Sequence, residues 1–193
     1  MDLVIINYGA GNIQSIRFAF ERLGFSPELS ADPDRISRAD KIIFPGVGEA
    51  SSAMAKLKQS GLDRLIPELK QPVLGICLGM QLMCRRSEEG GTPGLGIFDV
   101  DVVRFTGVPK VPQIGWNSIR NLASPLFQGV GEDEYIYLVH SYFAPLGAQT
   151  IATSEYGGPY SAALAEGNFF GVQFHPEKSG KTGARILKNF LEI

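Results

Sequence analysis

The 193-residue sequence has few of the residues that mark several protein classes. It contains two cysteines, two histidines and one tryptophan, and its formal net charge is −2. Two cysteines seven positions apart make neither a disulfide framework nor a zinc spacing, so both are expected to be free thiols. Because there is no basic excess, the sequence does not indicate binding to nucleic acid or to an anionic membrane.

Long hydrophobic runs are also missing. The N-terminal segment MDLVIINYGAGN carries an acid at position 2 and only a short apolar run, which matches neither a signal peptide nor a transmembrane helix. We therefore expect a cytoplasmic protein. The composition, with 44% hydrophobic and 20% charged residues, is that of an ordinary globular protein, and the length suits one domain over residues 1–193.

What the sequence does contain is an alternation of buried strands and helices. The apolar runs at 3–7, 41–44 and 72–76 predict parallel strands, with a shorter strand near 27–29. Helices are expected at 12–23, in one or two pieces within 49–69, and at 80–86. After Gly90, short runs of period two predict added antiparallel or mixed strands, and 181–193 predicts a closing helix. This order predicts an α/β fold with a mostly parallel central sheet and helices on both faces.

The most informative stretch is LGICLGMQLMC, residues 74–84. Cys77 follows a predicted strand, precedes a predicted helix and has Gly75 and Gly79 on either side. This G-x-C-x-G pattern is similar to a nucleophile elbow, in which small neighbours allow a sharp turn, and the N–H of Leu78 could donate to an oxyanion. The alternative is a buried structural cysteine, which is our expectation for Cys84 inside the apolar helix.

A cysteine nucleophile needs a general base, and the sequence offers two histidines. His175 lies in GVQFHPEKSG, again directly after a strand, and Glu177 two residues later could orient its imidazole. The alternative for His175 is a surface histidine in a polar loop. His140 has no carboxylate nearby in sequence and fits a strand histidine satisfied in the core, so it ranks second.

Three glycine-rich stretches remain. The turn PGVG at 45–48 could aim the N–H of Val47 or Gly48 into a cavity as a second oxyanion donor, or it could be only a tight turn. GAGNIQ lacks the third glycine of a dinucleotide-binding loop. SGKT at 179–182 lacks the glycine that a phosphate loop requires at position 175, so nucleotide binding is not expected. No metal site and no organic cofactor is indicated.

With Cys77, His175 and Glu177 together, the sequence resembles the class I, or triad, glutamine amidotransferases. Six motifs between residues 7 and 180 resemble, more narrowly, the glutaminase subunits of imidazole glycerol phosphate synthases. They are NYGAGN, FPGVGEA, GICLGMQLMCRRSEEG, PQIGWN, VHSYF and GVQFHPEKSG.

The resemblance implies a flavodoxin-like three-layer sandwich that hydrolyses L-glutamine to glutamate and ammonia through a thioester on Cys77. It also implies that the ammonia passes to a separate (β/α)8-barrel cyclase subunit, in a heterodimer that makes imidazole glycerol phosphate and AICAR in histidine biosynthesis. The candidate residues near the interface are Asn12, Trp116 and Tyr142. The alternative for Trp116 is a core tryptophan. The substrate-binding residues expected from the resemblance are Gly46, Gln81, Glu89, Ser141 and Tyr142.

One departure and three alternatives stand beside this interpretation. Gln113 occupies a position where many relatives have histidine, which we expect to alter a detail of the partner-facing surface. The chain could instead be the glutaminase of a pyridoxal phosphate or anthranilate synthase. It could also be a non-catalytic flavodoxin-like binding subunit, or a cysteine peptidase or hydrolase of similar fold.

Overall fold

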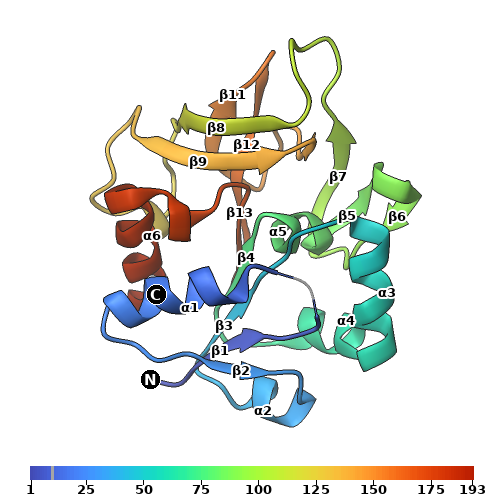
Figure 1. Ribbon diagram of the computed structural model, residues 1–193, viewed down its shortest axis with the longest axis vertical. Helices are drawn as coiled ribbons and strands as arrows, with labels where there is room; N and C mark the ends of the chain where they lie inside the picture. The colour runs from blue at the N-terminus through green and yellow to red at the C-terminus, as the bar shows by residue number, and fades with distance from the viewer. Residues whose placement is uncertain (10) are drawn as a thin grey trace.

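A seven-stranded sheet forms the centre of the molecule (Figure 1). The computed structural model describes residues 1–9 and 11–193. The strand order is β11-β12-β13-β4-β3-β1-β2, and the five strands from β13 to β2 are parallel, while β12 and β11 run antiparallel to their neighbours. The strands of this sheet are β1 (Leu3–Ile6), β2 (Glu28–Ser30), β3 (Lys41–Phe44), β4 (Val73–Ile76), β11 (Thr150–Glu155), β12 (Pro159–Glu166) and β13 (Phe169–Val172).

Helices cover both faces of this sheet. Because successive residues of a strand point to opposite faces, one strand contacts the helices on both sides. Val4 and Ile6 pack with α3 and α4, whereas Leu3 and Ile5 pack with α1 and α6. The predicted three layers are therefore confirmed. The helices are α1 (Ile13–Arg22), α2 (Pro33–Ser37), α3 (Ala50–Ser60), α4 (Leu62–Leu65), α5 (Leu78–Met83) and α6 (Gly180–Glu192), with 3-10 turns η1 (Ile66–Glu68), η2 (Glu89–Gly91), η3 (Pro125–Phe127) and η4 (Pro176–Lys178).

The remaining strands form two smaller sheets rather than extensions of the central one. A four-stranded sheet has the order β10-β7-β5-β6, and β8 pairs with β9 in a two-stranded antiparallel ribbon at the top of Figure 1. These strands are β5 (Cys84–Ser87), β6 (Thr92–Pro93), β7 (Phe98–Arg104), β8 (Gln113–Ser118), β9 (Tyr135–His140) and β10 (Tyr142–Phe143).

One predicted element is wrong in part. The helix expected at 80–86 ends at Met83, and Cys84 is the first residue of β5 rather than part of a helix. The N–H groups of Leu95 and Ile97 bond to the carbonyls of Leu82 and Met83, so a distant segment satisfies the end of this helix. Cys84 is nevertheless fully buried, and burial raises the pKa of its thiol, as expected of a structural cysteine.

In the described part of the chain, no helix combines the length and the apolar character needed to cross a membrane. Within the same residues, no group of three or more histidine, cysteine, aspartate or glutamate side chains is placed to hold a metal ion. Ala10, in the glycine-rich stretch after β1, lies outside the described residues.

Candidate active site

Cys77 stands on a strained turn at the carboxyl end of β4. Its backbone has φ +53° and ψ −110°, a conformation that costs a non-glycine residue about 1–3 kcal/mol. The N–H of Cys77 donates to the carbonyl of Val172 at 2.8 Å, and its own carbonyl accepts the N–H of Gln81 at 3.2 Å. The neighbouring strand and the first turn of α5 thus hold the strained residue in place, as a nucleophile elbow requires.

The two flanking glycines are needed for steric reasons. A Cβ on Gly79 would lie 2.0 Å from the carbonyl oxygen of Phe44, and one on Gly75 would lie 2.9 Å from the backbone nitrogen of Met80. The glycines therefore let α5 pack directly on β3 and β4. The sequence interpretation of G-x-C-x-G agrees with this local geometry.

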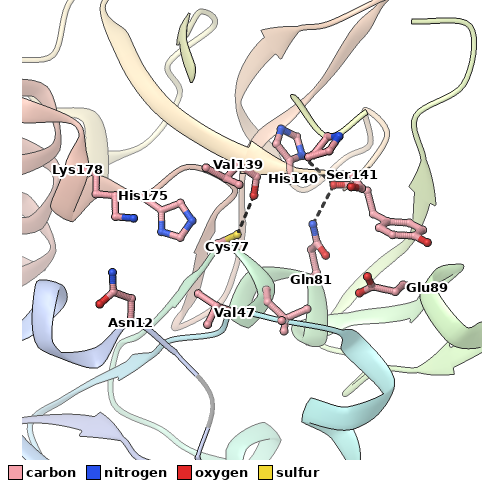
Figure 2. A pocket seen from close by; sticks show the side chains of 14 residues that line it. Asn12, Val47, Cys77, Gln81, Glu89, Val139, His140, Ser141, His175 and Lys178 are labelled. Atoms are coloured by element: carbon pink, nitrogen blue, oxygen red, sulfur yellow. Dashed lines mark hydrogen bonds between the residues drawn. The ribbon is translucent and has the colours of Figure 1, made fainter. Parts of the chain in front are cut away.

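His175 and Glu177 form a buried pair beside Cys77. His175 Nδ1 lies 2.9 Å from Glu177 Oε1, and the Glu177 side chain is fully buried. The other carboxylate oxygen, Oε2, is buried and has no hydrogen-bond partner within residues 1–9 and 11–193. The imidazole is thus the group that compensates this buried carboxylate, and its Nε2 is left free to face the sulfur (Figure 2).

Electrostatics favour the protonated form of His175. Burial alone would lower the pKa of this imidazole, but interactions with Cys77 and Glu177 outweigh it and raise the pKa to about 10. At neutral pH the imidazole is therefore expected to carry the proton, which places a cation beside the Cys77 sulfur. A neighbouring cation favours the thiolate form in which a cysteine acts as a nucleophile.

Cys77 opens into a cavity of about 490 Å³, a size that suits a small-molecule ligand. In Figure 2, Cys77 lies between His175 on one side and Gln81 and Glu89 on the other. The cavity lining contains most of the residues expected at the site, together with Pro112, Val139, His140 and Lys178. Those expected are Asn12, Val47, Gly48, Cys77, Leu78, Gln81, Glu89, Ser141, Tyr142 and His175.

The PGVG turn lies at the edge of this cavity. Val47 is exposed and Gly48 has φ +98°, so the turn uses the conformational freedom of a glycine. The hydroxyl of Tyr8 donates to the carbonyl of Pro45 at 2.9 Å and anchors the start of the turn. Gly46 is outside the cavity lining and packs on α5, where a Cβ would lie 2.6 Å from the nitrogen of Gly79. Its predicted substrate contact stays a prediction.

Glu89 supplies a negative charge to the cavity. Its Oε2 accepts the N–H of Ala50, the first residue of α3, at 2.8 Å. Burial raises the pKa of this carboxyl, the hydrogen bond from Ala50 opposes the rise, and nearby Glu49 adds to it. The carboxylate is thereby held in one orientation at the far end of the cavity from His175.

His140 and Gln113 belong to a buried polar cluster. His140 Nδ1 lies 2.8 Å from the carbonyl oxygen of Tyr142, and its Nε2 lies 3.0 Å from Gln113 Oε1. Burial lowers the pKa of His140 to about 4, so the ring is neutral and carries one N–H, which Nδ1 donates to the Tyr142 carbonyl. A buried strand histidine is what the sequence interpretation expected at this position. The expectation that Gln113 lies on a partner-facing surface is wrong, because its side chain is buried and also accepts the hydroxyl of Tyr160 at 3.1 Å.

The ribbon of β8 and β9 presents apolar side chains on its outer face. Ile114, Trp116 and Tyr135 are each more than half exposed, so Trp116 is not a core tryptophan. Trp116 packs edge-on against Tyr137, with ring centroids 5.8 Å apart. The carbonyl of Tyr137 accepts the N–H of His175 at 2.9 Å, which ties the ribbon to the turn that carries His175.

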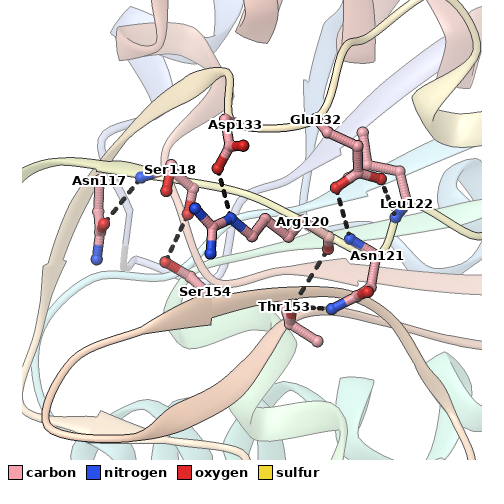
Figure 3. A network of polar contacts seen from close by, with 9 residues as sticks. All are labelled: Asn117, Ser118, Arg120, Asn121, Leu122, Glu132, Asp133, Thr153 and Ser154. Carbon is pink, nitrogen blue, oxygen red and sulfur yellow. Dashed lines mark hydrogen bonds and ion pairs between the residues drawn. The ribbon is translucent and has the colours of Figure 1, made fainter.

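A polar network holds the other end of the ribbon to β11 (Figure 3). Arg120 pairs with Asp133, and the Glu132 carboxylate accepts the N–H of Asn121 at 2.9 Å. The side-chain amide of Asn121 donates to the Thr153 hydroxyl at 2.8 Å. The ribbon is therefore fixed to the central sheet beyond Ser118, and within β9, at Tyr137, to the turn that carries His175.

Two buried polar residues near the site were missed by the sequence interpretation. Gln173 contacts the sulfur of Cys77, and Ser179 donates to the His175 carbonyl at 2.7 Å while accepting the N–H of Tyr137 at 2.9 Å. Both lie in the motif GVQFHPEKSG. The available signal was a polar side chain at the end of an apolar strand, since such a residue needs a partner when buried.

Comparison with known proteins places these features in a family. The family model for class-I glutamine amidotransferases matches residues 4–193. The subunit HisH of imidazole glycerol phosphate synthase is 55% identical in Bacteroides fragilis and 49% identical in Escherichia coli K12, in both cases over the whole of both chains.

Solved structures agree at the level of the fold. A glutamine amidotransferase structure superimposes with a TM-score of 0.76 at 18% identity, covering 98% of this chain and 97% of the other. A chain of PurLQS from Thermotoga maritima gives a TM-score of 0.73 at 17% identity, with coverage of 99% and 97%.

Proposed function

The chain belongs to the class-I glutamine amidotransferase family, and from this premise we propose that Cys77, His175 and Glu177 are its catalytic triad. The chain is the glutaminase subunit of an imidazole glycerol phosphate synthase and serves histidine biosynthesis. The observation that supports the triad is that the fold brings three groups together. They are an elbow cysteine after β4, a histidine after β13, and a buried carboxylate 2.9 Å from that histidine.

The first half-reaction forms a thioester. The Cys77 thiolate attacks the side-chain carboxamide carbon of L-glutamine, and the carbonyl electron pair moves onto the oxygen. When the tetrahedral intermediate collapses, the C–N bond breaks and the His175 imidazolium gives its proton to the departing nitrogen, which leaves as ammonia. The product is a γ-glutamyl thioester on Cys77, and His175 is now neutral.

The second half-reaction hydrolyses the thioester. Neutral His175 takes a proton from a water molecule as that water attacks the thioester carbonyl, and the C–S bond then breaks to release the Cys77 thiolate and a γ-carboxylic acid. This acid loses its proton to water and the product leaves as glutamate. His175 is left as imidazolium, as at the start. Glu177 keeps the imidazole in one orientation and stabilises its charged form throughout both steps.

The cavity supplies complementary groups for glutamine. The Glu89 carboxylate suits the α-ammonium group of the substrate, while Gln81, Ser141 and Tyr142 offer polar contacts along the same wall. The N–H of Leu78, at the start of α5, and that of Val47 or Gly48 in the PGVG turn stabilise the oxyanion. In this arrangement the carboxamide end of glutamine lies at Cys77 and its α-carbon end at Glu89.

The ammonia is consumed by a second subunit. We assign that role to a (β/α)8-barrel cyclase that forms a heterodimer with this chain in the cytoplasm and makes imidazole glycerol phosphate and AICAR. The outer face of the ribbon, with Ile114, Trp116 and Tyr135, is the surface proposed for docking, because these apolar side chains are exposed on the ribbon whose Val139 lines the cavity. Asn12 lies at the cavity edge and is placed at the same interface.

Ammonia release from glutamine, measured for the chain alone and with the cyclase subunit plus its nucleotide ligand, tests this function. We expect slow release alone and strong stimulation in the complex. Stimulation by a pyridoxal phosphate or anthranilate synthase partner in place of the cyclase would overturn the assignment of the partner. Inactivity under every condition would instead favour a non-catalytic binding subunit.

A further inference from the structure

Gln173 lies level with the nucleophile on the neighbouring strand. The parallel register pairs Val172 of β13 with Ile76 of β4, so Gln173 and Cys77 are the residues that directly follow the two strands. Gln173 is fully buried, and its N–H donates to the carbonyl of Ala162 at 2.8 Å. Gln173 and His175 both interact with the Cys77 sulfur.

The orientation of the Gln173 amide follows from a chain of three hydrogen bonds. The carbonyl oxygen of Tyr142 can only accept, and Gln81 Nε2 donates to it at 2.9 Å. The same Gln81 nitrogen donates to Gln173 Oε1, also at 2.9 Å. The acceptor side of Gln173 is thus occupied, and its Nε2 must point the other way, where it lies 3.8 Å from Cys77 Sγ.

A hydrogen-bond donor at this position stabilises a thiolate more than a thiol, because an N–H group binds a charged acceptor more strongly than a neutral one. The contact therefore favours ionised Cys77. It also makes the sulfur a better leaving group when the thioester breaks. The hydrogen bonds to the Tyr142 carbonyl and to Gln173 use both amide hydrogens of Gln81. Gln81 Oε1 is then the acceptor available to a ligand in the cavity.

We propose that Gln173 is a further catalytic residue, which donates a hydrogen bond to the Cys77 thiolate and stabilises it both before attack and when the thioester breaks. This inference rests on the proposed role of Cys77 as the nucleophile. His175 stabilises the same charge as a cation and moves a proton, whereas Gln173 acts as a fixed neutral donor that exchanges no proton.

The test replaces Gln173 with methionine, which keeps the length and removes the donor. In a Cys84→Ala background, Cys77 is the remaining thiol, and its rate of alkylation by iodoacetamide is followed against pH. We expect the midpoint to rise by about one pH unit, the loss of one hydrogen bond to a charged group. In the complex with the cyclase subunit, kcat for glutamine hydrolysis should fall about tenfold, while KM changes less than threefold.

Asn189→Leu is the matched control. Asn189 is a buried amide in α6 that donates to the carbonyls of Leu126 and Gln128, outside the residues lining the cavity. It should lower the melting temperature without moving the alkylation midpoint. Gln173→Glu, which keeps the acceptor for Gln81, is the second variant if the methionine variant does not fold, and a carboxylate there should raise the midpoint further.

The inference is overturned if the folded Gln173 variants keep the wild-type midpoint and lose activity only in proportion to their stability, as the control does. That outcome differs from failure of the proposed function, which would appear as glutamine hydrolysis persisting in Cys77→Ala.

Discussion

At the residue scale, the charge state of His175 depends on what the fold places around it. Burial alone would keep the imidazole neutral, yet its pKa is raised to about 10 because the Cys77 sulfur and the Glu177 carboxylate both lie against it. The His175 imidazolium should therefore persist through neutral pH and be lost as the pH rises through the pKa of His175. Removing the Glu177 charge should lower that pKa and shorten the pH range of the imidazolium at its alkaline end.

Glu177→Gln tests this directly. Loss of the carboxylate charge lowers the pKa of His175, so the alkaline limb of kcat/KM against pH should move to lower pH. We also expect kcat to fall by about 10²-fold or more, since the amide no longer stabilises the imidazolium. Glu192→Gln, at an exposed carboxylate in α6, is the control. An alkaline limb that stays at the wild-type pH would contradict the role given to Glu177.

The placement of site residues was predictable where local sequence dictates it. The flanking glycines predicted a sharp turn at Cys77, and the two-residue spacing predicted contact between His175 and Glu177; the structure has both. The predicted surface position of Gln113 was wrong. A glutamine in a period-two run gives no sign that it will contact His140 and Tyr160 in the core. Gln173 was missed because its partners, Gln81 and Cys77, are more than 90 positions away in sequence.

At the scale of elements, the elbow depends on how closely α5 approaches β3 and β4. At Gly79 this approach is limited by backbone atoms and not by movable side chains. A Cβ at this position would lie 2.0 Å from the Phe44 carbonyl oxygen. Any side chain at this position must displace the helix or the strand. Since Cys77 directly precedes α5 and the PGVG turn follows β3, the displacement would move the proposed nucleophile or the proposed oxyanion turn.

Gly79→Ala should therefore destabilise the protein by about 3 kcal/mol and abolish glutamine hydrolysis in whatever folds. Gly147→Ala is the control, because its Cβ would meet nothing within 4 Å, and its effect should stay within about 0.5 kcal/mol. Urea unfolding measures both. Equal stability of the two variants would mean that the close approach at Gly79 is not required.

Elements were predicted well where hydrophobic pattern alone determines them. The apolar runs at 3–7, 41–44 and 72–76 became β1, β3 and β4. The helix expected at 80–86 stopped early because the N–H groups that satisfy its last carbonyls come from 95–97, which no local pattern reveals. The short helix α2 was missed although Asp32 caps it and Pro33 opens it, a recognised start signal.

At the scale of the whole molecule, the ribbon of β8 and β9 joins the proposed docking face to the active site. Period-two runs could not predict that β8 and β9 form a sheet of their own, because the sheet to which a strand belongs depends on long-range contacts. The structure fixes the ribbon to β11 beyond Ser118, and to the His175 turn at Tyr137, the residue that pairs with Trp116. A partner that docks on Trp116 would thus contact an element bonded to the turn that carries His175.

Trp116→Ala should weaken binding of the cyclase subunit by about 2 kcal/mol, or roughly 30-fold in Kd, as expected for a large aromatic side chain at an interface. Basal ammonia release by the isolated chain should not change. Leu146→Ala, at an exposed apolar residue away from the ribbon, should leave the affinity intact. Titration calorimetry gives both values, and an unchanged Kd for Trp116→Ala would move the interface elsewhere.

The central claim is that Cys77 carries glutamine chemistry whose product is used by a separate subunit. The most direct measurement compares synthesis of imidazole glycerol phosphate by the complex containing Cys77→Ala, supplied either with glutamine or with an ammonium salt. We predict that the glutamine-dependent rate is lost and the ammonium-dependent rate is kept. Full glutamine-dependent synthesis by the Cys77→Ala complex would contradict the account.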